Sequence, residues 1–406
     1  MTNGNTVLDN LNDSSDSSVK LKDVHNVLDK WLYVADDKII DTILATCLSY
    51  KVRGDHVWLF LVGNSGDGKS ELLKSLSGCK NVLSLDQITP NTLASGKPNV
   101  EDLGNHLQDS DRILLFKDVA SLTSLHKDAK KQIWGQLRTL YDGYINKITG
   151  SGVEKKYNNC NVTLITATTP VIWHEFLNHQ ALGTRELYYS TNAKAEDDIH
   201  KMKRVKRNVA HKEEMTSEIH QVVYDFLESH SYKDIEVPED IEDYIYKQAI
   251  RLKVLRATAS TDAYTQELND LVYPEVPTRV SAQMVILYKA LKSLDNNYPD
   301  DRAKQIIKHI IDSSSFQIRK KIVEIFLESE HKTLGLSELT KKVDSGYRSV
   351  KRECEILWGM HVLKKDDNYE ASGMKREGNK MVKGNYKWKR YYTWNDEGDN
   401  PFDYAL

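Results

Sequence analysis

Eight consecutive residues have the types and spacing needed to bind phosphate groups. They match the pattern G-x-x-x-x-G-K-[ST] in full and are Gly63, Asn64, Ser65, Gly66, Asp67, Gly68, Lys69 and Ser70. Glycines in such a loop let backbone N–H groups wrap the phosphates, and the helix that follows adds the positive end of its dipole. We expect Lys69 to reach the β- and γ-phosphates of a nucleoside triphosphate and the Ser70 hydroxyl to ligate Mg²⁺.

A carboxylate and two hydroxyls are candidates for handling the metal ion and the attacking water beside this loop. Asp118 follows the apolar run at 112–116, where many ATPases carry two acidic residues in succession. It can hold Mg²⁺ or act as the catalytic base; the spacing favours the second role, and the chemistry decides neither. Thr168 and Thr169 end a later apolar run, where a polar side chain can orient the water. Ordinary strand-end threonines are an equally good interpretation.

Short apolar runs that alternate with helical periodicity must position these residues. The run at 56–62 is nearly all apolar, which is typical of a strand buried on both faces of a parallel sheet. Further strands are predicted at 81–85, 112–116, 161–168 and 186–190, and helices at 69–76 and 128–144, with two more between 24 and 50. This alternation indicates an α/β doubly wound sheet. The extra strand at 81–85, which precedes the acidic strand, indicates the additional-strand class of phosphate-loop proteins.

The composition excludes several classes of protein. The chain has 406 residues, of which 40% are apolar and 28% charged, a balance typical of a globular protein with two or three domains. Lys plus Arg total 56 and Asp plus Glu 59, so the net charge is −3 and any nucleic-acid surface has to be local. No apolar run approaches the roughly 20 residues of a membrane span, so we expect no membrane partner. Four cysteines without a CxxC pair fit a reducing, cytoplasmic location.

Shifts in composition divide the chain into five parts. Residues 1–22 are rich in Ser, Asn and Asp and predict a disordered arm. Residues 23–190 contain the phosphate loop and the predicted sheet. Residues 191–312 begin with a charged stretch, including KMKRVKR at 201–207, that indicates a linker or an exposed helix face, and they continue as an all-helical lid. Residues 316–394 form a separate unit, and residues 395–406 an acidic tail.

The pattern of the separate unit indicates DNA binding. Helices at 317–329, 333–343 and 347–360, followed by two strands around a long polar loop, form a winged helix-turn-helix pattern. Between 316 and 394 there are 18 Lys plus Arg and 11 Asp plus Glu, a local charge of +7, which leaves −10 for the rest. Phosphate contacts supply most non-specific DNA affinity, so this asymmetry favours a DNA surface over a protein-binding use of the same fold.

The candidate DNA contacts lie on the third helix and in the wing. Near the helix start, where major-groove contacts are made, they are Tyr347, Arg348, Lys351 and Arg352. In the wing they are Lys375, Arg376, Lys380, Lys383, Lys387, Lys389 and Arg390, interleaved with Tyr386 and Trp388. Base specificity does not follow from this pattern.

The motifs in this order resemble the AAA+ ATPases, and within them the branch of the minichromosome maintenance helicases. The resemblance runs over about residues 24–295 at the level of motifs. The segments LDQITPNTLASG, KDVASL, GQLRTLYDG, ATTPVIW and ALGTREL also resemble ATPases of phages and mobile elements. The resemblance implies an additional-strand core with a helical lid, ATP and Mg²⁺ as cofactors, and assembly into a homo-oligomeric ring.

Three basic sites are implied by the same resemblance. The segment 147–160 lies where that branch carries a basic hairpin that touches DNA in the pore, with Lys155 and Lys156 at its tip or flank. A solvated charged turn is an equal alternative. Arg185 stands at the place of the arginine finger, which reaches the nucleotide of a neighbouring subunit. Arg279 opens a lid helix, as the second sensor arginine does. Surface arginines are the alternative for both.

Two departures from the branch keep more than one function open. Its members carry a large N-terminal DNA-binding region, whereas only residues 1–55 precede the first predicted strand here, and Asp118 is a lone acidic residue. The leading hypothesis is an ATP-driven, DNA-binding helicase or translocase, or a replication factor of a mobile element. The alternative is a nucleotide-gated switch with slow hydrolysis that recognises an origin or operator. A weaker third hypothesis is an ATPase that remodels proteins.

Overall fold

The computed structural model describes most of the chain between residues 19 and 405. The described ranges are 19–119, 122, 124–150, 152–173, 185–191, 194–330, 332–370, 375–377, 380–382 and 387–405. Residues 195, 368–370, 375–377, 380–382 and 387–389 are described by their backbone alone. The expected disordered arm at 1–22 lies almost wholly outside these ranges, and its last two residues already belong to helix α1 (Leu21–Trp31).

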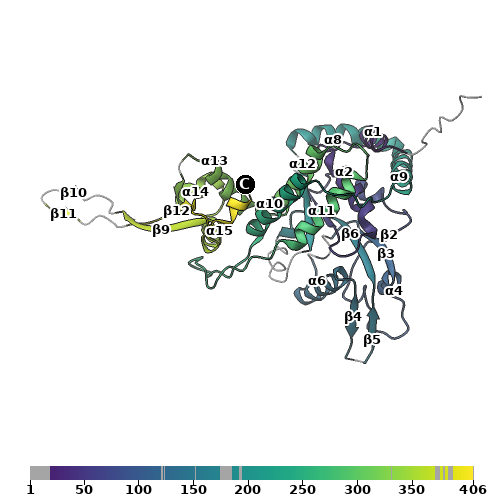
Figure 1. Cartoon of the computed structure of the whole chain (residues 1–406), viewed down its shortest axis with the longest axis horizontal. Helices are drawn as coiled ribbons and strands as arrows, with labels where there is room; N and C mark the ends of the chain where they lie inside the picture. Colours follow the sequence, from purple (N-terminus) through teal and green to yellow (C-terminus); the bar gives the residue numbers. More distant parts are fainter. Residues whose placement is uncertain are drawn as a thin grey trace, which may run out of the picture.

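A five-stranded parallel sheet forms the centre of the larger body (Figure 1). Its strands, in spatial order, are β2 (Val82–Leu85), β3 (Ser110–Phe116), β6 (Cys160–Thr168), β1 (Trp58–Val62) and β7 (Glu186–Ser190). β6 lies between β1 and β3, so the strand before Asp118 is not a neighbour of the strand before the phosphate loop. All four ladders are parallel, so the predicted α/β fold with a parallel sheet is confirmed.

Helices cover both faces of this sheet, as the uninterrupted apolar run of β1 predicts. Leu59 and Leu61 pack into one core cluster, whereas Trp58, Phe60 and Val62 pack into the other. Burial of each such side chain stabilises the fold by about 1.5–3 kcal/mol. The first cluster includes α1, α2 (Lys38–Leu48), α3 (Lys69–Lys74), α9 (Lys212–Ser229), α10 (Glu239–Arg256), α11 (Thr278–Lys292) and α12 (Asp300–Ser313), and the second includes α4 (Leu103–Leu107) and α6 (Lys127–Tyr141).

Of the two interpretations of the charged stretch at 201–207, the exposed helix face is confirmed and the linker is wrong. The stretch lies in helix α8 (Ala195–Asn208), which continues through the 3₁₀ turn Val209–His211 into α9. Acidic residues in the first turn of α8 and basic residues in its last turn complement the helix dipole. Residues 257–277 are not helical, although the part of the region 191–312 after the charged stretch was expected to be all-helical. They connect α10 to α11 with an isolated bridge between Thr261 and Leu268.

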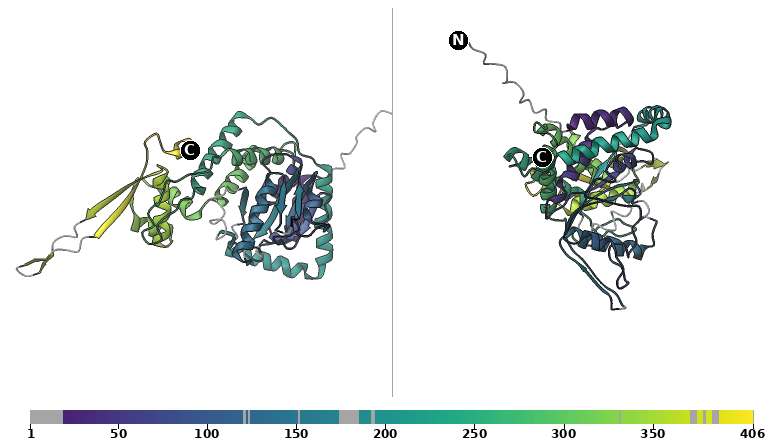
Figure 2. Two further views of the ribbon diagram at one scale, coloured as in Figure 1. Left: turned by 90° about the horizontal axis from the view of Figure 1, so that it is seen from below. Right: turned by 90° about the vertical axis from the view of Figure 1, so that its right-hand side faces the viewer.

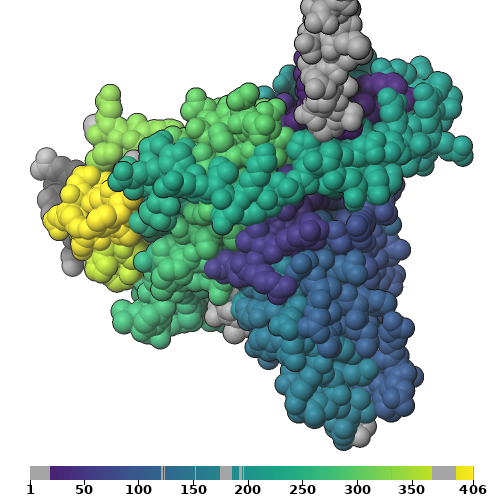
Figure 3. Space-filling model, turned by 45° about the vertical axis from the view of Figure 1, so that its right-hand side comes forward, coloured from purple at the N-terminus to yellow at the C-terminus, as the bar shows by residue number. Residues whose placement is uncertain are grey.

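A two-stranded hairpin connects α6 to β6 and projects from the body (Figures 1 and 3). It is formed by β4 (Ile145–Ile148) and β5 (Glu154–Tyr157), which pair antiparallel. At its base, the Tyr157 ring lies against Gly104, where an added Cβ would be 2.2 Å from ring carbons. Ile148, near the turn, is 70% exposed, so the outer end of the hairpin is accessible to a partner.

The C-terminal unit consists of three helices and a three-stranded antiparallel sheet. Its elements are α13 (Gln317–Glu328), β8 (Thr333–Gly335), α14 (Leu336–Val343), α15 (Tyr347–Gly359), β9 (Leu363–Glu370) and β12 (Lys387–Trp394), and the sheet order is β8-β12-β9. The helix expected at 333–343 is therefore a short strand followed by a helix. β9 and β12 extend away from the body as a long arm towards the paired β10 (Lys375–Glu377) and β11 (Lys380–Val382) (Figures 1 and 2).

The last residues are packed against this unit and do not form a free tail. Phe402, in the 3₁₀ turn Pro401–Tyr404, is buried and stands edge-on to Trp394, with 5.8 Å between ring centroids. Apolar burial therefore outweighs the acidic character of this segment. Among the described residues, no helix combines the length and apolarity that crossing a membrane requires.

A buried arginine joins α10 to the C-terminal unit. Arg319 on α13 is 1% exposed and donates two hydrogen bonds to Glu353 on α15, at 2.8 and 3.0 Å. Its Nη1 also donates to the carbonyls of Val254 and Ala257, at the end of α10. A buried ion pair tolerates loss of one partner poorly, because the other charge then lacks both water and counter-charge.

We predict that Arg319→Ala lowers the free energy of unfolding of the C-terminal unit by about 3 kcal/mol. Urea denaturation measures this quantity. The exposed Arg348→Ala is the control and should change it by less than about 0.5 kcal/mol. The double variant Arg319→Met/Glu353→Leu should recover most of the loss, because it removes both charges. Equal stability of Arg319→Ala and Arg348→Ala would contradict this role.

Candidate functional site

The phosphate-loop pattern forms a tight turn between the end of β1 and the start of α3. Gly66 and Gly68 have φ angles of 88° and 81°, in the left-handed region that favours glycine. Lys69 is buried, and its Nζ donates to the carbonyls of Gly63 at 2.8 Å and Asn64 at 2.7 Å. The lysine therefore lies folded along the inner side of the loop, as the sequence predicts for a residue that faces bound phosphates.

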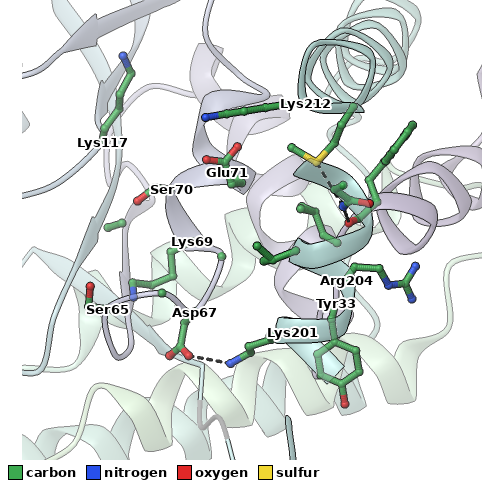
Figure 4. A pocket seen from close by; sticks show the side chains of 18 of the residues that line it. Tyr33, Ser65, Asp67, Lys69, Ser70, Glu71, Lys117, Lys201, Arg204 and Lys212 are labelled. Atoms are coloured by element: carbon green, nitrogen blue, oxygen red, sulfur yellow. Dashed lines mark hydrogen bonds and ion pairs between the residues drawn. The ribbon is translucent and has the colours of Figure 1, made fainter. Parts of the chain in front are cut away.

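This loop forms one wall of a pocket of about 590 Å³. Most residues predicted to act on a nucleotide meet there, although they come from three strand ends. The pocket is lined by Trp31, Leu32, Tyr33, Ser65, Gly66, Asp67, Gly68, Lys69, Ser70, Glu71, Lys117, Asp118, Ala167, Thr168, Thr169, Lys201, Arg204, Val205, Asn208, Val209, Lys212 and Met215 (Figure 4). Because the carboxyl ends of parallel strands meet at one edge of a sheet, β1, β3 and β6 deliver these groups together.

Asp118 and the two threonines lie on the sheet side of the pocket. The Asp118 side chain is exposed, and its charge is close enough to act on Lys69. Burial lowers the pKa of Lys69, while Asp67 and Asp118 oppose that effect. Thr168 is buried and Thr169 half-buried. The Thr168 carbonyl accepts a hydrogen bond from the Gly63 N–H at 3.2 Å, so the end of β6 helps to hold the loop in place.

A lysine of α8 contacts the phosphate loop, and the sequence analysis did not identify it. Lys201 Nζ lies 2.8 Å from Asp67 Oδ1, and the Thr191 hydroxyl donates to Asp67 Oδ2 at 2.8 Å (Figure 4). Burial disfavours the Asp67 carboxylate, but these two partners outweigh burial and hold its pKa below the ordinary value. Pocket-lining positions on α8, the 3₁₀ turn and α9 are spaced as 201, 204, 205, 208, 209 and 212. This helical periodicity was the signal that could have found them.

The far end of the pocket is apolar. Trp31 is the last residue of α1, Leu32 and Tyr33 follow it, and Val205 and Met215 line the same pocket from α8 and α9. The Tyr33 ring stacks on His200 with centroids 5.1 Å apart, and its hydroxyl donates to Asp197 at 2.9 Å. A charged, loop-lined end and an apolar, aromatic end suit a ligand that joins phosphates to a planar ring.

The structure does not bring Arg185 and Arg279 to the phosphate loop of the same chain. Both lie beside the Tyr141 ring, with guanidinium carbons 5.5 and 6.0 Å from its centroid. Arg185 donates to both carboxylate oxygens of Asp142, at 2.9 and 3.1 Å, and Arg279 Nη1 lies 2.6 Å from Glu275 Oε1. Their sequence separation gave no sign that they form one cluster. We name this group, which consists of Tyr141, Asp142, Arg185, Glu275 and Arg279, the arginine cluster.

Both hairpin lysines lie on β5, on the flank of the hairpin and not at its turn. Lys155 is 14% exposed in its side chain, and its Nζ donates to the Val100 carbonyl at 2.9 Å and lies 3.5 Å from Asp102. Lys156 is 56% exposed and pairs with Glu154. Of the two, only Lys156 faces solvent enough to meet a strand of nucleic acid without a change in the hairpin.

The basic residues predicted to bind DNA in the C-terminal unit have different environments. Tyr347 and Arg348, at the start of α15, are exposed. Arg352 lies 2.8 Å from Glu353, and Lys351 lies 3.5 Å from Glu267. Arg390 is held by three carboxylates, those of Asp367, Glu355 and Glu267. The side chains of Lys375, Arg376, Lys380, Lys383, Tyr386, Lys387, Trp388 and Lys389 lie outside the described residues.

Comparison with known proteins adds no relative. Neither the models of protein families nor the curated proteins contain a match to this chain.

Within the described part of the chain, no cluster of three or more His, Cys, Asp or Glu side chains is arranged to hold a metal ion. The function has to be argued from the geometry of the pocket and of the C-terminal unit.

We predict that Gly63→Ala destabilises the protein, because an added Cβ would lie 2.1 Å from Thr191 Oγ1 and 2.7 Å from Asp67 Oδ2. Overpacking of this kind costs about 1–3 kcal/mol of unfolding free energy. Gly135→Ala on α6 is the matched control, since its Cβ would meet nothing within 4 Å and helix propensity should stabilise it by roughly 0.5–1 kcal/mol. Thermal denaturation of both variants tests the contrast, and a Gly63→Ala protein as stable as Gly135→Ala would refute it.

Proposed function

We propose that the chain is an ATP-hydrolysing, DNA-binding protein of the AAA+ type. The observation that carries the proposal is the pocket at the strand ends, which is lined by residues 65–70 of the phosphate-loop pattern, a carboxylate and two strand-end threonines. The sheet order, with β6 inserted between β1 and β3, supports the additional-strand core over residues 23–190. Helices of 191–312 then act as the lid, since α8 and α9 close one side of the pocket.

The chain's own residues supply most of what phosphoryl transfer to water needs. The loop N–H groups and Lys69 bind the β- and γ-phosphates and offset the charge that develops on the transferring group. Thr168 or Thr169 orients the water that attacks the γ-phosphorus, and Asp118 either accepts its proton or orders the metal's water shell. The products are ADP and inorganic phosphate.

The donor set at the loop fits Mg²⁺. The Ser70 hydroxyl and the Asp118 carboxylate both line the pocket and are exposed, and a hydroxyl with a carboxylate is a ligand pair that Mg²⁺ accepts while keeping several waters. When bound, the ion would neutralise charge on the β- and γ-oxygens.

The C-terminal unit supports the DNA-binding part of the proposal. The chain order α13, β8, α14, α15, β9, β12, with the three strands in one antiparallel sheet, supports a winged helix. Tyr347 and Arg348 are exposed at the start of α15, the end that enters the major groove in such domains. The +7 charge of residues 316–394 supplies the phosphate contacts.

A homo-oligomeric ring accounts for the two arginines that lie away from the pocket. Each subunit would present its arginine cluster to the nucleotide of the next, where Arg185 acts as the finger and Arg279 as the second sensor. Asp142 and Glu275 would hold these guanidinium groups until a neighbour's phosphates replace them. Replication or maintenance of a mobile element is the setting implied by the sequence resemblance.

A nucleotide-gated switch with slow hydrolysis is the second candidate function. Lys155, Lys351 and Arg390 each make ion pairs within the chain, so the DNA surface is partly covered by the protein's own carboxylates. A switch requires such a covered state, whereas a translocating motor has to expose its contacts in every cycle.

We predict that wild-type protein hydrolyses ATP and that Lys69→Ala lowers kcat/KM at least about 100-fold, because the variant loses a positioned phosphate contact. Lys74→Ala is the matched control: it lies on the same helix, pairs with Glu71 and is half-exposed. Steady-state phosphate release at low, constant salt measures both, with and without single-stranded and double-stranded DNA.

The DNA dependence separates the candidate functions. Strong stimulation by DNA that is lost in Lys69→Ala supports the motor. A slow rate that is indifferent to DNA, together with ATP-dependent DNA binding, supports the switch. Absence of ATP binding by the wild type would overturn the proposed function, and stimulation by a protein partner alone would favour protein remodelling.

A further inference from the structure

Lys201 is the feature of the pocket that the AAA+ proposal does not use. We propose that Lys201 is a phosphate-binding residue, held by Asp67 until a nucleoside triphosphate enters and then transferred to the phosphates. This inference rests on the proposed function and deepens it, because it assigns the lid helix α8 a direct contact with the ligand.

The position of Lys201 is that of a ligand-binding residue. Its side chain is 16% exposed, it lines the pocket, and its Nζ lies 2.8 Å from an Asp67 oxygen that belongs to the phosphate loop itself. The loop N–H groups around Asp67 are expected to wrap phosphates, so the Lys201 ammonium group lies beside the expected phosphate position. Lys69 and Lys201 also repel each other, and this lowers the pKa of Lys69 further after burial.

The charge of the pocket favours an anion that takes Lys201 from Asp67. Five cationic side chains line it against three carboxylates, namely Lys69, Lys117, Lys201, Arg204 and Lys212 against Asp67, Glu71 and Asp118. A triphosphate offers several charged oxygens to an ammonium group, whereas Asp67 offers two and already accepts the Thr191 hydroxyl. The exchange leaves Asp67 with that hydroxyl as a partner.

The exchange would move the lid, because α8 is attached to the end of α1. Asp197 accepts from Tyr33, and Arg204 donates to the Lys30 carbonyl at 2.9 Å. Lys201, on the same helix, donates a hydrogen bond to Asp67 in the phosphate loop. A shift of its ammonium group towards phosphates therefore pulls α8 and Tyr33 over the apolar end of the pocket.

Substitutions on the two sides of the Lys201–Asp67 ion pair show whether Lys201 binds the ligand or only stabilises the fold. Lys201→Met should weaken ATP binding about 10- to 100-fold, the equivalent of one charge-assisted hydrogen bond of roughly 1.5–3 kcal/mol, and should weaken ADP binding less. Asp67→Asn should raise ATP affinity, because it releases Lys201 and removes a negative charge from the pocket. Lys201→Arg should restore most of the affinity. Lys203→Ala, exposed on the same helix, is the control.

Titration calorimetry with ATP and ADP gives a result for each outcome. If the Lys201–Asp67 ion pair only holds the structure together, Lys201→Met and Asp67→Asn should lose equal amounts of ATP affinity. This result would overturn the proposal. Unchanged affinity in Lys201→Met, with a wild type that binds ATP, would overturn this inference alone. A wild type that binds neither nucleotide would overturn the proposed function as well. Circular dichroism confirms that each variant is folded.

A second inference comes from the non-helical connection at 258–277, which we name the strap. It contains Asp262, Glu267, Asp270 and Glu275 and no Lys or Arg. Glu267 Oε1 lies 3.2 Å from Arg390 and 3.5 Å from Lys351, and these hydrogen-bonded cations, Arg390 first, lower the pKa of Glu267. We infer that the strap competes with DNA phosphates for the basic face of α15.

Packing as well as charge holds the strap on α15. Leu268 and Val272 pack so closely on Gly359 that an added Cβ would lie 2.6 and 2.7 Å from their side chains. Gly359 and Lys351 are eight residues apart and therefore on one face of the helix. The other end of the strap reaches the arginine cluster, where Glu275 pairs with Arg279 at 2.6 Å. The strap therefore links the basic face of α15 to the start of α11.

We predict that Glu267→Gln raises the affinity for a fluorescent DNA duplex about fivefold at low, fixed salt, because Lys351 is released and Arg390 loses one of its three carboxylates. Asp270→Asn removes the same charge from an exposed strap position and should leave the affinity within about twofold. Lys351→Ala should abolish the gain in the Glu267→Gln background. Anisotropy titration measures each affinity.

Equal DNA affinities in the wild type and Glu267→Gln would overturn the strap while leaving DNA binding in place. Equal gains in Glu267→Gln and Asp270→Asn would assign the effect to net charge and would also overturn it. If no variant binds DNA, both the strap and the DNA-binding part of the proposed function fail.

Discussion

The site depends on how closely three parallel strand ends approach one another. The Thr191 N–H donates to the Val62 carbonyl at 2.8 Å, and the Gly63 N–H donates to the Thr168 carbonyl. These bonds continue the ladders of β1 with β7 and β6 beyond the sheet edge, and they fix where the phosphate loop begins. The approach leaves no room for a side chain at position 63, and it delivers Thr168 and the loop to one side of the pocket.

Local excess of positive charge is the second constraint, because cations that are close together repel one another. The chain pairs several of them internally. Lys69 binds loop carbonyls, Lys201 binds Asp67, Arg185 binds Asp142 and Lys351 binds Glu267. Each partner is a group that an entering phosphate can replace. The same interaction therefore stabilises the unliganded fold and limits binding to ligands with enough charge to compete.

The sequence predicts the parts of the structure that local pattern determines. The loop, the parallel strands, and the three helices and long hairpin of the C-terminal unit follow from short-range periodicity and glycine placement, whereas strand β8 was expected to be the start of a helix. Lys201 was missed because its charged surroundings in KMKRVKR indicate solvent, and only packing against α1 turns one side of α8 inwards. The arginine cluster and the strap were also missed. They bring together residues far apart in the chain, such as Lys351 and Glu267, and no local signal reports such a contact.

The arrangement of α11 offers a physical route between the two proposed binding surfaces. Gln283 on this helix is buried and donates to the carbonyls of His56 and Arg185, which precede β1 and β7. One turn earlier, Arg279 belongs to the arginine cluster and holds the strap through Glu275. A neighbour's nucleotide that draws Arg279 away would remove its ion pair with Glu275 and so weaken the hold on this end of the strap. Nucleotide phosphates would then displace Glu275 from Arg279 at one end of the strap, and DNA phosphates would displace Glu267 from Lys351 at the other. ATP binding in one subunit would in this way favour DNA binding in the next.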